Sequence, residues 1–205
     1  MTVRTTRFRQ SVIRTVLGLA ALSGLAMQPV ESAFAKVVEV SMTAVETKLV
    51  IDGEGHTYDA WTFNGQFPGP VIRVQEGDEV VFSLTNPETN GRPHSMDFHA
   101  AETNFLEHYK EVRPGESLQY RFKAKWPGVF AYHCGASPMI QHIARGMMGA
   151  IIVDPKDPKA MPKADREYVL VQSELFKEPD DVDGMFDRKY QHVVFNGAVF
   201  RYDQV

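Results

Sequence analysis

Side chains that bind transition metals are concentrated between residues 94 and 147. His94 and His99 lie in one short segment, and a second segment has the spacing His-Cys-x7-His-x4-Met, formed by His133, Cys134, His142 and Met147. Cys134 is the only cysteine of the chain. Two imidazoles, a thiolate and a thioether form a soft, mixed nitrogen and sulfur ligand set. Such a set is typical of a type-1 copper site that transfers electrons.

Other chemistries could use some of these residues. Zinc would more often recruit a second cysteine or a carboxylate. A Cys–His nucleophile is a competing interpretation, but it does not account for the histidine and methionine that follow Cys134 at fixed spacing. Met148 is the alternative to Met147 as the weak axial ligand, and the spacing from His142 favours Met147.

The alternation of side chains along a strand divides the ligands between two sites. His133 and Cys134 are adjacent and should point in opposite directions at the end of a strand. His94 and His99 are five residues apart and should also face opposite ways. The prediction is one site made by His94, Cys134, His142 and Met147, and a second site that contains His99 and His133.

The second site would be open and would contain an acid. Asp97 is two residues before His99, so both side chains should share a face of an extended segment. Two histidines are too few for a stable metal site, so a third ligand must come from elsewhere. An ionisable carboxylate beside an open metal position is suited to proton delivery to a bound oxyanion. The peptide between His133 and Cys134 would connect the two sites.

Short β-rich runs separated by turn residues must position these ligands. We expect strands at 37–42, 71–74, 79–84, 117–122, 129–133 and 150–153, with turns such as Pro68-Gly69-Pro70, Glu76-Gly77-Asp78 and Pro127-Gly128 between them. Many short strands at this spacing predict a β-sandwich over residues 36–155. No segment shows sustained helical periodicity, so helices should be few and short.

Composition agrees with a globular protein. The 205 residues are 43% hydrophobic, 23% charged and 11% aromatic, which excludes disordered, collagen-like and multipass membrane classes. The formal net charge is -4, so the chain has no general electrostatic attraction to nucleic acid.

Residues 1–35 have the pattern of a secretory signal peptide. An arginine-rich start is followed by the apolar run 15–27, which is short for a membrane span, and by Ala33-Phe34-Ala35 before Lys36. An uncleaved membrane anchor is the alternative. We expect an exported, periplasmic protein that does not reside in the membrane. A lone thiol in an oxidising compartment should be buried or bound.

The rest of the chain suggests a second domain that is incomplete. Residues 156–165 are rich in Pro and Lys and form a predicted linker. We expect a strand at 166–175 and an acidic loop at 178–187. The tripeptide Phe63-Asn64-Gly65 recurs as Phe195-Asn196-Gly197, which predicts that residues 166–205 begin a second sandwich. A chance tripeptide in a short extension is the alternative.

Four motifs together resemble the copper-containing nitrite reductases, the enzymes that form nitric oxide in denitrification. These motifs are Phe63-Asn64-Gly65-Gln66-Phe67-Pro68-Gly69-Pro70, His94-Ser95-Met96-Asp97-Phe98-His99-Ala100-Ala101, Tyr132-His133-Cys134 and His142-Ile143-Ala144-Arg145-Gly146-Met147. The resemblance implies an all-β, cupredoxin-like Greek-key sandwich. It also implies type-1 copper on His94, Cys134, His142 and Met147, type-2 copper on His99 and His133, and Asp97 as the active-site acid.

The resemblance also implies partners. In that family the third type-2 histidine and a further active-site histidine come from the second domain of a neighbouring subunit in a homotrimer, and this chain has neither position. Nitrite would be the substrate, and a small cupredoxin or cytochrome c the electron donor. The family's glycine-rich loop after the second type-2 histidine is replaced here by residues 102–108, ETNFLEH. We expect this chain alone to be inactive.

Two other functions compete with nitrite reduction. A multicopper oxidase with a trinuclear centre would need His-x-His pairs and a His-Cys-His sequence, but the chain has no His-x-His and Gly135 follows Cys134. A cupredoxin that only carries electrons would leave Asp97, His99 and His133 without a role, which the position of His133 beside Cys134 disfavours.

Overall fold

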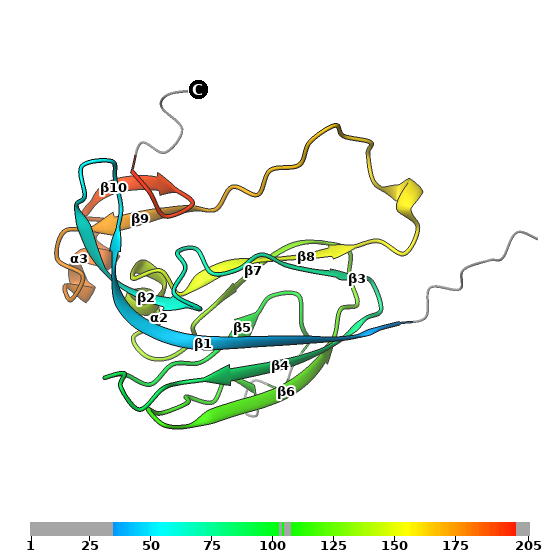
Figure 1. Ribbon diagram of the computed structural model, residues 1–205, viewed down its shortest axis with the longest axis horizontal. Coiled ribbons are helices and arrows are strands. Elements are labelled where there is room, and N and C mark those ends of the chain that lie inside the picture. The colour runs from blue at the N-terminus through cyan, green and yellow to red at the C-terminus, as the bar shows by residue number, and fades with distance from the viewer. Residues whose placement is uncertain (1–34, 103, 105–107, 200–205) are drawn as a thin grey trace, which may run out of the picture. The chain divides into compact units, whose positions relative to one another are not determined.

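The computed structural model describes residues 35–102, 104 and 108–199, so the predicted leader lies outside the described residues. Strands dominate this part of the chain (Figure 1). The strands are β1 (Val37–Val50), β2 (Thr57–Phe63), β3 (Ile72–Gln75), β4 (Glu79–Thr85), β5 (Asp97–Phe98), β6 (Ser117–Lys123), β7 (Gly128–His133), β8 (Met148–Asp154), β9 (Gln172–Phe176) and β10 (Tyr190–Phe195). The helices are α2 (Met139–Ala144), α3 (Val182–Phe186) and the 3₁₀ turn η1 (Pro158–Ala160).

The first eight strands form two four-stranded sheets, with the orders β2-β1-β4-β6 and β3-β8-β7-β5. Strand β1 belongs to two pairings, because residues 37–43 pair in parallel with β4 and residues 44–50 pair antiparallel with β2. Strand β7 lies between β8 and β5, antiparallel to both. The all-β Greek-key sandwich expected from the sequence is confirmed, and the helices are few and short in the described residues.

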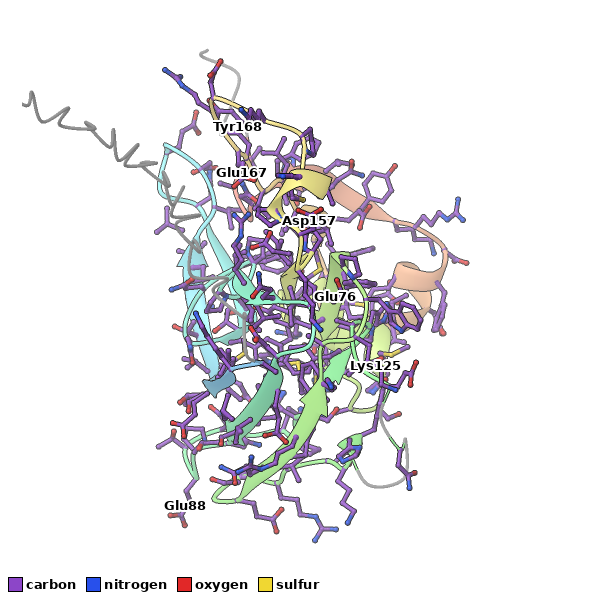
Figure 2. All side chains as sticks on the ribbon, turned by 90° about the vertical axis from the view of Figure 1, so that its right-hand side faces the viewer. Glu76, Glu88, Lys125, Asp157, Glu167 and Tyr168 are labelled. Atoms are coloured by element: carbon purple, nitrogen blue, oxygen red, sulfur yellow. The ribbon has the colours of Figure 1, made fainter. Side chains whose placement is uncertain are left out.

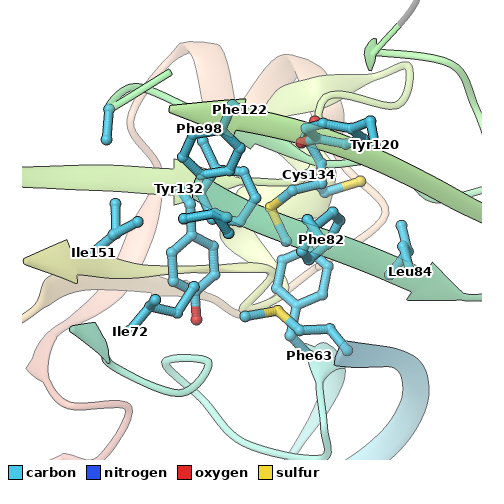
Figure 3. Close-up of a cluster of buried hydrophobic side chains, with 14 of the residues drawn as sticks. Phe63, Ile72, Phe82, Leu84, Phe98, Tyr120, Phe122, Tyr132, Cys134 and Ile151 are labelled. Atoms are coloured by element: carbon cyan, nitrogen blue, oxygen red, sulfur yellow. The ribbon is translucent and has the colours of Figure 1, made fainter. Parts of the chain in front are cut away.

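Aromatic side chains from both sheets fill the space between them (Figure 3). Phe82 of β4 packs edge-on against Phe98 of β5, with ring centroids 5.0 Å apart. Phe98 also contacts Tyr132 of β7 at 5.6 Å. The Tyr132 hydroxyl donates a hydrogen bond to the Pro70 carbonyl over 2.6 Å. This core fixes the end of β7, where Cys134 follows directly.

A turn with a buried carboxylate joins β3 to β4. Asp78 accepts hydrogen bonds from the backbone N–H groups of Gln75 and Lys36, each over 2.8 Å. The same carboxylate therefore closes the turn and attaches the start of β1 to it. Charged side chains elsewhere, such as Glu88, Lys125 and Glu167, are exposed (Figure 2).

Residues after β8 run along the surface through η1 (Figure 1). Arg73 of β3 binds Asp154 and Glu167, each at 2.7 Å, and so attaches both ends of this segment to the sheet. The predicted strand at 166–175 is wrong in its first part, because β9 begins only at Gln172. The predicted acidic loop at 178–187 contains α3, whose first turn is capped by the Asp181 carboxylate on the Gly184 N–H.

The repeated tripeptide forms the same turn twice. Asn64 and Asn196 have φ values of 57° and 51°, and the glycines that follow have 71° and 73°. These positive φ values explain the Asn-Gly sequence, because other residues are strained there.

The hydrogen bonds repeat as well. The Asn64 backbone donates to Thr43 while its side chain accepts from the Thr43 N–H, and Asn196 does the same with Val171. The β9–β10 hairpin is therefore equivalent to the β1–β2 hairpin.

The predicted domain boundaries (1–35, 36–155, 156–165 and 166–205) stay predictions. No helix among the described residues is long and apolar enough to cross a membrane.

Candidate metal centres

Three separate segments bring a buried group of donor atoms together. His94 lies before β5 and exchanges two backbone hydrogen bonds with Val112. Cys134 follows β7, and its N–H donates to the Met147 carbonyl over 2.9 Å. His142 lies in the short helix α2. The sandwich core and this helix thus hold the donors in place before any metal is bound.

The donor atoms of this first group converge on one point. The Nδ1 atoms of His94 and His142 are 3.2 Å apart, and the Cys134 Sγ is 3.3 Å from the His142 Nδ1. All three side chains are buried. Two buried imidazole nitrogens and a buried sulfur fit a soft transition-metal ion such as copper.

Burial sets the protonation of the group without metal. Burial raises the pKa of the Cys134 thiol to about 11, although backbone hydrogen bonds from Ser95 and Ala136 oppose this. Burial lowers the pKa of His142 to about 3, and repulsion from His94, then Arg92, adds to the effect. At neutral pH the metal-free group therefore holds a neutral imidazole and a protonated thiol.

The two methionines after α2 lie in different surroundings. Met147 is fully buried in the same core cluster as Cys134, and its N–H donates to the His142 carbonyl over 3.0 Å. Met148 begins β8, is only half-buried and pairs with His133. This placement supports Met147 as the axial ligand, which stays a prediction.

Trp61 lies against the first group and was not singled out from the sequence. Its ring is 4.7 Å from that of His142, and the Arg145 guanidinium lies 4.4 Å above it. Arg145 is fixed by hydrogen bonds to the carbonyls of Asp59 and Pro179. The contact between Trp61 and His142 joins β2 to α2, and no pattern in the sequence predicts this contact.

A second, more open group contains Asp97, His99 and His133. The register of β5 against β7 places Asp97 directly opposite His133. The Nε2 atoms of His99 and His133 are 3.0 Å apart, and the Asp97 Oδ2 is 3.6 Å from each of them. The His99 side chain is 51% exposed, whereas those of His133 and Asp97 are 13% exposed.

Hydrogen bonds orient two members of this group. The His133 Nδ1 lies 3.0 Å from the Cys134 carbonyl, which can only accept, so Nδ1 carries the proton and the Nε2 lone pair faces His99. The Tyr109 hydroxyl donates to the Asp97 Oδ1. Burial and this contact raise the pKa of Tyr109, so it remains a donor. No pattern in the sequence indicates a role for Tyr109.

Neighbouring residues connect the two groups. His133 and Cys134 share a peptide bond. Ser95, which follows His94 in the chain, forms two hydrogen bonds with the segment after β7. Its N–H donates to the Cys134 Sγ over 3.3 Å, and its Oγ accepts from the Gly135 N–H over 2.9 Å. The structure thus brings together each of the two predicted sets of histidine, cysteine and aspartate side chains. Their roles as ligands and acid stay predictions.

Comparisons with known proteins find multicopper oxidases and copper-containing nitrite reductases. Residues 44–158 match the multicopper oxidase family. A copper-containing nitrite reductase of Pseudomonas chlororaphis is 40% identical over 190 residues, which cover 80% of this chain and 52% of that protein. Another, of Rhizobium sullae, is 41% identical over 191 residues, or 80% of this chain and 50% of that protein. The chain therefore spans about half the length of these relatives.

Solved structures give the same result. The copper nitrite reductase from Nitrosomonas europaea has a TM-score of 0.81 and 57% identity, covering 82% of this chain and 59% of that one. The crystal structure of a multicopper oxidase has a TM-score of 0.70 and 30% identity, covering 81% of this chain and 56% of that one.

Proposed function

The chain belongs to the multicopper oxidase family, and because its relatives include copper-containing nitrite reductases, we propose that it forms the copper-binding part of an enzyme that reduces nitrite to nitric oxide. Nitrite, one electron and two protons would give nitric oxide and water. The observation that supports this most directly is the presence of two donor groups of different character, joined by the His133–Cys134 peptide. One group is buried and rich in soft donors, and the other is open and contains an acid.

Copper bound at the two groups would supply one-electron redox chemistry. His94, Cys134 and His142, with Met147 beside them, would hold type-1 copper in a buried site suited to electron transfer. His99 and His133 would hold type-2 copper. Among the described residues, the second group offers two imidazoles and one carboxylate. Its third histidine would come from a neighbouring subunit of a homotrimer.

Asp97 would deliver a proton to nitrite. Its Oδ2 faces the imidazole nitrogens of His99 and His133, while its Oδ1 accepts a hydrogen bond from Tyr109. One oxygen is thus held by Tyr109, and the other lies 3.6 Å from both imidazole nitrogens that would bind the metal. A carboxyl group in this arrangement is suited to general-acid catalysis.

The peptide between Cys134 and His133 would carry the electron, because it is the shortest covalent path between the two groups. The donor would be a small cupredoxin or cytochrome c. We further propose that the protein is exported to the periplasm, on the basis of the leader pattern in residues 1–35.

Copper titration of the chain followed by absorption spectroscopy tests the first group. The loaded chain should be blue or green, because a thiolate bound to Cu(II) absorbs visible light. Cys134→Ala should be colourless, and the control His192→Ala, which belongs to neither group, should keep the colour. A visible band that survives in Cys134→Ala would contradict the assignment.

The same preparation tests the second group. We propose that the 205-residue chain alone fills the type-1 site and reduces no nitrite, because two imidazoles do not complete a type-2 site. Metal analysis, electron paramagnetic resonance and a nitric oxide electrode measure this. A stoichiometric type-2 signal with steady nitric oxide production would show that the described residues complete the site by themselves.

A further inference from the structure

Building on the proposed type-1 site, we propose that Glu46 is a positioning residue for His94. It would hold the imidazole in one tautomer and orientation, and its negative charge would lower the reduction potential of copper held by that imidazole. Glu46 lies in β1, outside every motif that carries the family resemblance, and is 48 residues away from His94.

The geometry of His94 indicates the tautomer. The Glu46 Oε1 is 3.2 Å from the His94 Nε2, and the opposite ring nitrogen, Nδ1, is 3.2 Å from the Nδ1 of His142. A carboxylate can only accept a hydrogen bond, so Nε2 carries the proton. The Nδ1 lone pair then points to the place where the donors of His142 and Cys134 converge.

Glu46 is itself held in place. Its carboxylate accepts hydrogen bonds from the backbone N–H groups of Gly91, over 3.1 Å, and Arg92, over 2.9 Å. The Asn90 side chain adds a link, since its amide donates to the Ala44 carbonyl over 2.9 Å. Only 22% of the Glu46 side chain is exposed. A carboxylate held by the N–H groups of Gly91 and Arg92 and by the His94 ring is unlike a solvated glutamate on a surface strand.

A purely structural role for Glu46 would not require its contact with His94. If Glu46 only joined β1 to the turn at 90–92, a neutral amide could accept the same backbone hydrogen bonds. The additional contact with His94 places a negative charge beside a ligand of the metal. Acceptors of this kind orient ligating histidines and increase their basicity. A half-buried charge at this distance favours Cu(II) over Cu(I), which lowers the reduction potential.

Spectroelectrochemistry of the copper-loaded chain tests the electrostatic part. E46Q should keep the visible band and the copper content but show a higher reduction potential than the unaltered chain. E39Q removes an exposed carboxylate from the same strand and should leave the potential unchanged. An unchanged potential in copper-loaded E46Q, or an equal rise in E39Q, would overturn the proposal.

Nitrogen-15 NMR of the histidine rings tests the positioning part, in the metal-free chain and in the diamagnetic Cu(I) form. His94 should be protonated at Nε2, and that proton should exchange slowly with water. In E46A the exchange should become fast. A His94 ring protonated at Nδ1 in the unaltered chain would overturn the proposal even if E46Q failed to fold. A failure of the unaltered chain to take up copper would instead contradict the proposed function, and the metal-free spectrum would still decide the role of Glu46.

Discussion

Two adjacent residues, His133 and Cys134, contribute to two different donor groups. Cys134 is buried in the core with His94 and His142, while His133 lies beside Asp97 and His99. The last pairing of β7 determines this division, because Asp97 is directly opposite His133 and Cys134 lies one residue further on. At the scale of single residues, the alternation along a strand separates electron transfer from proton delivery in the proposed enzyme.

Asp97→Asn is the sharpest test of proton delivery. In a protein whose second group is complete, this variant should keep the type-1 colour and normal copper content, because Asp97 is not in the first group. Nitrite turnover should fall by roughly 10²-fold or more, the usual loss when a general acid is removed. The control Glu88→Gln changes an exposed carboxylate outside both groups. Turnover at the level of the control would assign Asp97 a structural role only.

The metal-free chain should be most stable between about pH 6.5 and pH 9. Folding raises the pKa of Cys134 from 9.0 to about 11, so its contribution is complete below pH 9 and is lost as the pH rises toward 11. Folding lowers the pKa of His142 from 6.5 to about 3, so stability is lost as the pH falls through that range. Urea unfolding across the pH range measures both limits. Cys134→Ala should remove the loss between pH 9 and pH 10 and leave the acidic one. Above pH 10 buried tyrosines such as Tyr132, whose pKa burial raises, add a loss of their own.

At the scale of elements, the close approach of β7 to β8 leaves no room for a side chain at one position. Gly149 pairs with Tyr132, and a Cβ there would collide with the buried tyrosine ring. Gly149→Ala should therefore cost about 1–3 kcal/mol of unfolding free energy, as overpacking does. Gly53→Ala has no atom within 4 Å of the new Cβ and should be nearly neutral. Equal midpoints in denaturant unfolding would contradict this account.

The six strands expected in residues 37–153 are present, because each alternates or is continuously apolar and is bounded by turn residues. The strands β2 and β5 were not predicted, and β1 continues to Val50, beyond its expected end at residue 42. The short helices were harder to predict. Helix α2 has only six residues and α3 only five, which is too short to show a helical period. The predicted strand starts before β9, since residues 166–171 have no assigned secondary structure and the pairing with β10 begins at Gln172.

The two groups of donors could be inferred from residue types and strand parity, but their supporting residues could not. Glu46, Trp61 and Tyr109 contact the groups only because β1, β2 and the segment before β6 are folded against them. None of the three has a sequence spacing that points to a metal site. Contacts between distant segments depend on sheet register, which a single sequence does not determine.

For the whole molecule, copper should act as a stabilising link. The first group joins the loop before β5, the end of β7 and α2, so the metal would bind the folded chain and not the unfolded one. At a free copper concentration 100 times the dissociation constant, the gain is about 2.7 kcal/mol. Thermal unfolding with increasing copper should show a rising midpoint. In Cys134→Ala the rise should be largely lost, and a full rise in that variant would mean that copper binds elsewhere.

The β1–β2 and β9–β10 hairpins form a structural repeat within the chain. The turns at Asn64 and Asn196 share their φ values and their hydrogen bonds, although 132 positions separate them in the numbering of the sequence. The metal-binding motifs lie between these two turns, at residues 94–147.

The position of Trp61 gives the molecule an internal optical reporter. The chain has two tryptophans, of which Trp61 is 6% exposed and lies beside His142, while Trp126 is 61% exposed. Buried indoles fluoresce at shorter wavelengths than hydrated ones, and Cu(II) quenches indoles close to it. Cu(II) bound by the first group should therefore reduce the short-wavelength emission of Trp61, while the long-wavelength emission of Trp126 serves as a reference. Chemical reduction to Cu(I) should restore the Trp61 emission. The ratio of short-wavelength to long-wavelength emission would then report the oxidation state of the copper without an added label.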